Sequence, residues 1–273
     1  MFLRLDLNKN FCIYANGGFG RKEMFPTSDI DISIIEMSKP KSYENLEKFV
    51  SSLWDEGYQI GHSVRSIQDI KKISKQDVKE FTSYLTRRPI ITVDEVDSKI
   101  TKVLFRLWSK DKFFNAKNDE QLVRHKDYHS TSYNLEPDLK ESPGTLRDFQ
   151  TALWILQHCF GLDDLKSIEY SDNFKNDISS AIEAYNFIKT LRFASNVFTK
   201  KNRLNFEAQI DISKIAKLKT KSTNRSVEIM IKKFYEMASI LTDFNELVFE
   251  TYKEKDLKIK KYTNDTYKLN NKI

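Results

Sequence analysis

The stretch that decides the fold is Gly17-Gly18-Phe19-Gly20-Arg21-Lys22-Glu23-Met24-Phe25-Pro26-Thr27-Ser28-Asp29-Ile30-Asp31, which leads into Ile32-Ser33-Ile34-Ile35. Before it, Phe11-Cys12-Ile13-Tyr14-Ala15 has the composition of a buried strand. Glycines let the backbone turn tightly and bring bare N–H groups close to a ligand. A strand that turns through glycines into a helix start is typical of phosphate binding. The pattern therefore predicts a phosphate cradle at Gly17, Gly18 and Gly20, with Arg21 in the first helical turn.

The second half of this stretch supplies two carboxylates. Asp29 and Asp31 lie two positions apart in a run with strand composition, so both side chains leave one face, about 6 to 7 Å apart. Magnesium prefers one or two carboxylates together with substrate phosphates. A lone glycine turn or a lone Asp-x-Asp is often only structural. Their ordered joint occurrence predicts a site for phosphoryl or nucleotidyl transfer, with Asp29 and Asp31 as Mg²⁺ ligands.

Length and composition indicate a globular protein. The chain has 273 residues, of which 40% are hydrophobic and 12% aromatic, enough for one large or two small domains. Its net charge of +6 comes from lysines spread along the chain, which favours a solvated surface, so nucleic acid is not an expected partner. Cys12 and Cys159 lack metal-ligand spacing and are expected to be buried thiols. No apolar run is long enough to span a membrane or resembles a signal peptide, so we expect a cytoplasmic protein with no membrane partner.

Apolar spacing predicts helices over most of the remaining chain. The expected helices cover residues 43–54, 67–85, 97–114, 146–160, 176–199, 204–218 and 222–253. We place a domain boundary near residue 105, which gives a sheet-containing domain over 1–105, a helical domain over 106–255 and a frayed lysine- and asparagine-rich tail over 256–273. The predicted fold class is α+β, with a mixed sheet followed by an all-α helical bundle.

Residues 58–66 alternate in polarity and predict a strand with two different faces. The apolar set is Tyr58, Ile60, His62 and Val64, and the other set is Gln59, Gly61, Ser63 and Arg65. The polar face is predicted to line the nucleotide site, with Arg65 on a phosphate and Ser63 making a hydrogen bond. The alternative is an ordinary half-exposed strand. His62 is expected to be a core histidine.

These motifs resemble the bacterial PII uridylyltransferases, bifunctional enzymes that modify the PII nitrogen-regulatory protein. The run 17–35 is similar to the signature of their nucleotidyltransferase domain. Further matches follow in order at Leu53-Trp54-Asp55-Glu56-Gly57, Ile60-Gly61-His62-Ser63-Val64-Arg65-Ser66, Tyr133-Asn134-Leu135-Glu136-Pro137-Asp138-Leu139-Lys140-Glu141-Ser142-Pro143-Gly144 and Leu146-Arg147-Asp148-Phe149-Gln150. The resemblance covers roughly residues 11 to 253, and a collinear set of motifs is more specific than any one of them.

The resemblance implies a polymerase-β-like nucleotidyltransferase fold that moves UMP from UTP to a hydroxyl group of PII, with Mg²⁺ as cofactor. It assigns Asp29, Asp31 and position 59 to catalysis. The residues expected at the nucleotide are Gly17, Gly18, Gly20, Arg21, Ser28, Ser63 and Arg65. Full-length members continue into an HD-type phosphohydrolase domain and two ACT domains. The chain has four histidines and no His directly followed by Asp, so we expect it to transfer but not to remove UMP.

One position departs from the family pattern. Enzymes of this fold use a third carboxylate on a neighbouring strand, and the resemblance places that ligand at Gln59. An amide offers an oxygen without charge, which would weaken the second metal of a two-metal site. Asp55, Glu56 or Asp77 could substitute for it. The alternative function is therefore a catalytically weak, nucleotide-binding relic or regulator, and an interaction module that binds no nucleotide is a third.

The second patterned stretch, residues 133–150, predicts an extended loop followed by a helix. Thr145 to Asp148 resembles a capping box at the start of that helix. Two hypotheses remain for Glu136, Lys140, Arg147 and Asp148. They could close over the nucleotide or the protein substrate, or they could form a salt-bridged buttress between the domains.

Overall fold

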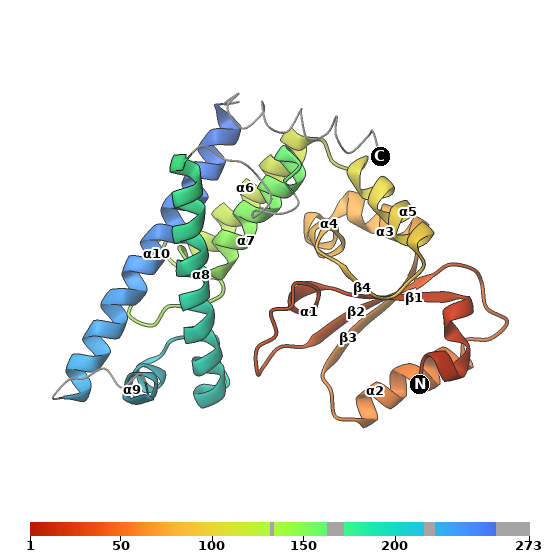
Figure 1. Ribbon diagram of the computed structural model, residues 1–273, viewed down its shortest axis with the longest axis horizontal. Helices are drawn as coiled ribbons and strands as arrows, with labels where there is room; N and C mark the ends of the chain where they lie inside the picture. Colours follow the sequence, from red (N-terminus) through yellow and green to blue (C-terminus); the bar gives the residue numbers. More distant parts are fainter. Residues whose placement is uncertain (132–133, 163–171, 216–221, 255–273) are drawn as a thin grey trace. The chain divides into compact units, whose positions relative to one another are not determined.

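The computed structural model describes residues 1–131, 134–162, 172–215 and 222–254 (Figure 1). The chain divides into two compact units, Met1–Ser109 and Lys110–Ile273. The predicted boundary near residue 105 coincides with the end of helix α5 (Asp94–Phe105), four residues before the first unit ends. The predicted tail lies outside the described residues.

The first unit is built on a four-stranded mixed sheet in the order β3-β2-β1-β4. Its strands are β1 (Phe11–Ala15), β2 (Ile30–Glu36), β3 (Ile60–Ser66) and β4 (Arg88–Ile91). β1 is antiparallel to β2 and β4, whereas β2 and β3 are parallel. Every residue of β1 is buried, as expected for an apolar run in the middle of a sheet.

Helices cover both faces of this sheet (Figure 1). α2 (Glu44–Asp55) packs on one face, where Phe49 and Val50 join Ile32 and Ile34 in a buried cluster. Two short 3₁₀ turns, Leu3–Leu5 and Leu7–Lys9, add Leu7 to the same cluster. α3 (Ile67–Gln76), α4 (Val78–Leu85) and α5 lie over the other face. The sheet therefore has one apolar side under α2 and one side that faces α4.

Two expectations about the first unit were wrong. The helix predicted over 67–85 is interrupted because Asp77 takes an extended conformation and its side chain accepts the N–H of Lys79 at 2.7 Å. The sequence pattern did not predict strand β4, which contains Pro89. β4 is an edge strand, where a residue without an N–H donor is tolerated.

The second unit is helical in its described parts. Its elements are α6 (Lys110–Asp127), α7 (Leu146–Ile155), a π-helical turn (Leu156–Phe160), α8 (Asp172–Thr199), α9 (Phe206–Ile215) and α10 (Thr223–Lys253). The helix predicted over 97–114 is two helices, since α5 ends at Phe105 and α6 begins at Lys110. α10 packs against α7, α8 and α9 and buries Phe234, Leu241 and Val248. The predicted α+β fold class, with a mixed sheet followed by an all-α region, is confirmed.

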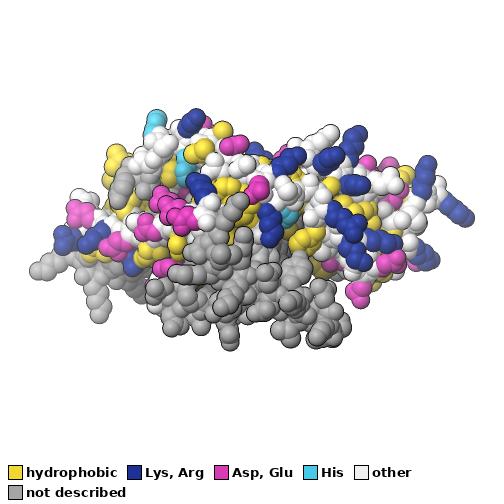
Figure 2. All heavy atoms as spheres, turned by 90° about the horizontal axis from the view of Figure 1, so that it is seen from above, with side chains coloured by type: hydrophobic (Ala, Val, Ile, Leu, Met, Phe, Trp, Pro, Cys, Tyr) yellow, Lys and Arg dark blue, Asp and Glu magenta, His cyan; other side chains and the backbone are white. Residues whose placement is uncertain are grey.

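The surface carries charge of both signs. On the face in Figure 2, Lys and Arg side chains are scattered, with Asp and Glu side chains among them. Within the described ranges, no helix combines the length and the apolar character needed to cross a bilayer.

Candidate functional site

Asp31 lies against two glycines that belong to different elements. A Cβ atom on Gly17 would stand 2.6 Å from Oδ2 of Asp31, and a Cβ atom on Gly61 would stand 2.7 Å from Oδ1. Gly61 is the partner of Asp31 in the parallel β2–β3 ladder. The N–H of Asn16, directly before Gly17, donates to the Asp31 carbonyl at 2.9 Å. The structure thus brings the second aspartate and the first glycine of the turn together.

Asp29 and Gln59 stand where strands β2 and β3 begin. Asp29 is exposed and precedes β2 by one residue, and the N–H of Ile30 donates to the Gln59 carbonyl at 2.8 Å. Gln59 is exposed as well. Parallel strands that start at the same edge place their first residues side by side. The two predicted metal ligands and the amide at position 59 therefore belong to one end of the sheet.

Among the described residues, no third carboxylate is grouped with Asp29 and Asp31. Across the described parts of the chain, no three His, Cys, Asp or Glu side chains are close enough to hold one metal ion. Asp77 caps α4, and Asp55 is the last residue of α2. The described residues therefore give no support to the hypothesis that Asp55, Glu56 or Asp77 substitutes for a carboxylate at position 59.

The glycine stretch forms a single helical turn, α1 (Gly17–Gly20), and not the start of a longer helix. Gly17 has φ +52°, which residues with a side chain rarely adopt. The N–H of Gly20 donates to the Asn16 carbonyl at 2.7 Å and that of Arg21 to the Gly17 carbonyl at 3.2 Å, so two of the amides predicted to meet phosphate are already hydrogen-bonded. The side chain of Asn16 does not cap the turn. The N–H groups of Gly17 and Gly18 thus stand at its uncapped start.

Asn16 presents a buried acceptor beside this turn. The residue is 4% exposed, and its Nδ2 donates to Oγ and the carbonyl oxygen of Ser83 at 3.0 and 3.2 Å. Within the described residues its Oδ1 has no hydrogen-bond partner. A buried acceptor left unpaired costs roughly 1–3 kcal/mol. Sequence reasoning missed Asn16, which carries no motif of its own.

The predicted arginines are paired with carboxylates of the first unit. Nε of Arg21 lies 2.9 Å from Oε2 of Glu23. Arg65 donates from Nη1 to Glu80 at 2.6 Å and to the hydroxyl of Tyr84 at 3.2 Å. The hydrogen bond with Glu80 raises the pKa of Arg65 above its ordinary value. A phosphate contact by either arginine would have to compete with these pairs.

The predicted serines have local partners. Oγ of Ser28 accepts the N–H of Phe25 at 3.0 Å and so closes the turn that precedes Asp29. Ser63 lies on the same face of β3 as Gly61, with its Oγ 3.4 Å from that of Ser33, which in turn donates to Tyr84 of α4. His62 points to the opposite face, where its ring centre is 5.4 Å from that of Trp54 on α2. The two faces predicted for this strand are present, but His62 is exposed. The expectation that it is a core histidine was therefore wrong, because it lies on an edge strand that α2 covers only in part.

In the second patterned stretch, Asp148 is held within the helical unit. Its Oδ1 accepts from Arg124 at 2.6 Å and lies 2.9 Å from Nε2 of His125, and its Oδ2 accepts the N–H of Gly144 at 2.7 Å. The Thr145 hydroxyl donates to the Ser142 carbonyl and makes no cap hydrogen bond. The predicted capping box is therefore wrong, because Asp148 turns back to Gly144 instead.

The other charged residues of that stretch also have partners in the helical unit. Glu136 accepts the N–H of Phe206 at 3.0 Å. Glu141 accepts from Arg147 at 3.1 Å and lies 3.3 Å from Nζ of Lys140. Burial by itself raises the pKa of Glu141, but the charges of Arg147 and Lys140 outweigh it and lower that pKa to about 2. These contacts stabilise the loop from inside one unit.

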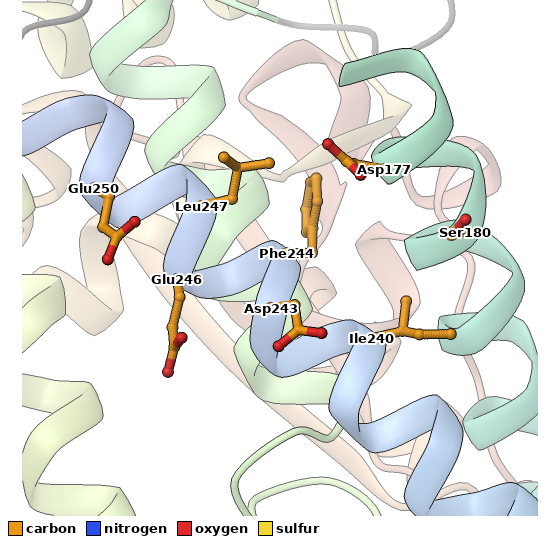
Figure 3. Close-up of a pocket in the computed structure, with 8 residues that line it drawn as sticks. All are labelled: Asp177, Ser180, Ile240, Asp243, Phe244, Glu246, Leu247 and Glu250. Carbon is orange, nitrogen blue, oxygen red and sulfur yellow. The ribbon is translucent and has the colours of Figure 1, made fainter. Parts of the chain in front are cut away.

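A separate cavity of about 510 Å³ lies between α8 and α10 (Figure 3). Asp177 and Ser180 come from α8, and the remaining lining residues come from α10. Their carboxylates are Asp177, Asp243, Glu246 and Glu250. Since its described lining contains no cation, this cavity lacks the chemistry to bind a phosphate, and the candidate site remains the end of the sheet at Asp31.

The Gly61→Ala variant is expected to weaken magnesium-dependent nucleotide binding without unfolding the protein. The new methyl group would stand 2.7 Å from Oδ1 of Asp31 and push the carboxylate aside. Gly61 itself is exposed on an edge strand, so alanine costs the fold little. Titration of UTP with Mg²⁺ and thermal denaturation of the free protein measure the two effects. The matched control is Gly57→Asn, at a position where a Cβ atom would meet no atom within 4 Å.

Comparisons with known proteins agree on one family. The profile described as GlnD PII-uridylyltransferase matches residues 112–249. The bifunctional uridylyltransferase/uridylyl-removing enzyme of Haemophilus influenzae (strain PittEE) is 36% identical over 251 residues, 89% of this chain and 29% of that protein. The enzymes of that name from Pasteurella multocida (strain Pm70) and Hydrogenovibrio crunogenus are each 32% identical over 93% of this chain. The chain spans about 30% of the length of these relatives.

Among solved structures, a toxin-antitoxin crystal structure with AMP-PNP matches 48% of this chain and 96% of its own, with 16% identity and a TM-score of 0.26. A score this low carries no argument about the site.

Proposed function

This chain belongs to the GlnD PII-uridylyltransferase family, and from that premise we propose that it is a metal-dependent nucleotidyltransferase that moves UMP from UTP to a hydroxyl group of PII. The observation that carries the proposal is the carboxylate of Asp31, which lies against both Gly17 and Gly61. This contact supports the proposal, because it brings a carboxylate beside the backbone turn that would receive the phosphates.

In this proposal Asp29 and Asp31 hold Mg²⁺, and the amides of Gly17 and Gly18 receive the β and γ phosphates. The donor set fits one nucleotide-bound ion, because Mg²⁺ is ordinarily held by one or two carboxylates and completed by phosphate oxygens and water. When bound, the ion neutralises the phosphates and favours departure of pyrophosphate. The pairing of Arg21 and Arg65 with Glu23 and Glu80 leaves their phosphate contacts as predictions.

The choice of UTP and PII rests on the names of the relatives, which act as uridylyltransferases. Their similarity covers about nine tenths of this chain. The proposal therefore concerns the transfer reaction, and it rests on the glycine turn and the two aspartates.

Two measurements test this function. Thermal shift with UTP in the presence and absence of Mg²⁺ reports binding, and incubation with PII and labelled UTP reports transfer. We expect a magnesium-dependent rise in melting temperature and label on PII. A protein with no magnesium-dependent shift would not be a nucleotidyltransferase of this type, and ATP in place of UTP serves as the control for the base.

The second candidate function is a nucleotide-binding protein with little catalysis, and Gln59 favours it. Gln59 lies beside Asp29, where its amide oxygen carries no charge, and the described residues offer no third carboxylate. The Gln59→Glu variant is expected to increase transfer about tenfold or more, because it restores an anionic ligand for the second metal. Labelling of PII by the variant and by the parent measures the difference. An unchanged rate would mean that position 59 does not hold a metal.

A further inference from the structure

Arg88, the first residue of β4, donates hydrogen bonds to the C-terminal end of the glycine turn. Its Nη2 donates to the Phe19 carbonyl at 3.0 Å and its Nε to the Gly20 carbonyl at 3.3 Å. The guanidinium carbon also lies 5.2 Å from the centre of the Phe19 ring. One side chain therefore fixes two successive carbonyl groups from a strand almost seventy residues away in sequence.

The charge of Arg88 is not matched by a carboxylate. Arg21, Arg65 and Arg87 each pair with an acidic side chain of the first unit, at 2.9, 2.6 and 2.8 Å. Arg88 makes no such ion pair within the described residues, and it donates to the two carbonyl oxygens instead. Its positive charge thus acts on the peptide groups of the turn. A hydrogen bond from a charged donor is roughly twice as strong as one between neutral groups.

Two hydrogen-bonded paths lead from this guanidinium to the start of the turn. The Phe19 carbonyl shares a rigid peptide group with the Gly20 N–H, which donates to the Asn16 carbonyl, and that carbonyl shares a peptide group with the Gly17 N–H. The second path runs from the Gly20 carbonyl through the Arg21 N–H to the Gly17 carbonyl and so to the Gly18 N–H. Each link makes the next N–H a better donor, because bonded peptide groups polarise one another.

We propose that Arg88 is a positioning residue for the triphosphate: it orients and polarises the amides of Gly17 and Gly18 through these two paths. The inference rests on the proposed function and adds to it a cation on β4 that touches no phosphate. The buried, unpaired Oδ1 of Asn16 lies on the same turn and marks it as a place built to meet a ligand.

The test begins with the nucleotide-free protein. In Arg88→Gln the neutral side chain cannot polarise both carbonyls, so the amide proton resonances of Gly17 and Gly18 are expected to move upfield. The amide of Gly57, which bonds the Trp54 carbonyl at the end of α2, should stay in place. Arg88→Lys keeps the positive charge but loses the planar guanidinium group that reaches both carbonyls. The chemical shifts of the Gly17 and Gly18 amide protons should lie between those of the parent and of Arg88→Gln.

Binding is measured next by calorimetry with MgUTP and with UMP. Arg88→Gln is expected to raise the dissociation constant for MgUTP about tenfold, in line with the loss of a charged hydrogen bond. Binding of UMP, which lacks the β and γ phosphates, should be unchanged. The control is Arg87→Gln, which removes a neighbouring ion pair with Asp97 but no link of either path.

The possible results distinguish a failure of the role proposed for Arg88 from a failure of the proposed nucleotidyltransferase function. Unmoved glycine resonances in Arg88→Gln would disprove the two paths whether or not UTP binds. Moved resonances with parent-like MgUTP affinity would disprove the role in phosphate binding while the proposed function stands. Equal losses in Arg87→Gln and Arg88→Gln would reduce the role of Arg88 to stability. A parent protein that binds no MgUTP would overturn the proposed function and the phosphate role together.

Discussion

The Asp31→Asn variant is expected to lose UMP transfer by about a thousandfold or more and to fold as the parent does. Asparagine has nearly the same shape as aspartate, so its side chain can take the same place between Gly17 and Gly61. This place is available because neither glycine carries a Cβ atom. It removes the negative charge that an ion bridging to the phosphates requires. Labelled PII measures transfer, and circular dichroism with thermal denaturation measures the fold.

The control for this variant is Asp55→Asn, an exposed carboxylate at the end of α2. It changes the net charge equally and is expected to leave transfer unchanged. Persistent labelling by Asp31→Asn would show that the metal is held elsewhere, and the assignment of Asp29 would fail with it.

The Asp148→Ala variant is expected to destabilise the helical unit by about 3–5 kcal/mol, the usual cost of removing one partner from a buried ion pair. The carboxylate is 2% exposed and binds Arg124, His125 and the N–H of Gly144. Without the Asp148 carboxylate, the charge of Arg124 loses this partner, although the Arg124 side chain is only 11% exposed. Urea denaturation followed by circular dichroism measures the change, because most of the helix lies in this unit.

Asp243→Ala is the matched control for that experiment. Asp243 is an exposed carboxylate on α10, beside the cavity between α8 and α10, and its removal should change stability by less than about 0.5 kcal/mol. Equal stability of Asp148→Ala and the parent would contradict a structural role. The loop at residues 134–145 would then owe its conformation to its other hydrogen bonds.

Local patterns were sufficient for much of the fold. The apolar run at β1, the helical spacing of α2 and α10, and the alternation of β3 depend on periodicities of two and 3.6 residues, which neighbours in sequence reveal. Gly57, which follows α2, has a φ of +81° that suits few other residues. The misses have two causes. The strand at Pro89 pairs with Tyr14 of β1, which is distant in the sequence. The break at Asp77 and the unformed cap at Thr145 come from competing local hydrogen bonds, from the N–H of Lys79 to Asp77 and from the N–H of Gly144 to Asp148.

For the candidate site, the amino-acid sequence alone predicted the glycine turn and the two aspartates, because these are residue types whose chemistry is evident in any context, and the resemblance to the family added the departure at Gln59. The three-dimensional arrangement was needed to learn that Gly61 makes room for Asp31, that Arg21 and Arg65 already have carboxylate partners, and that Arg88 reaches the turn from β4. Hydrogen bonds and ion pairs act over about 3 Å. Which residues stand that close depends on strand order and register, and these bring together positions as far apart as Phe19 and Arg88.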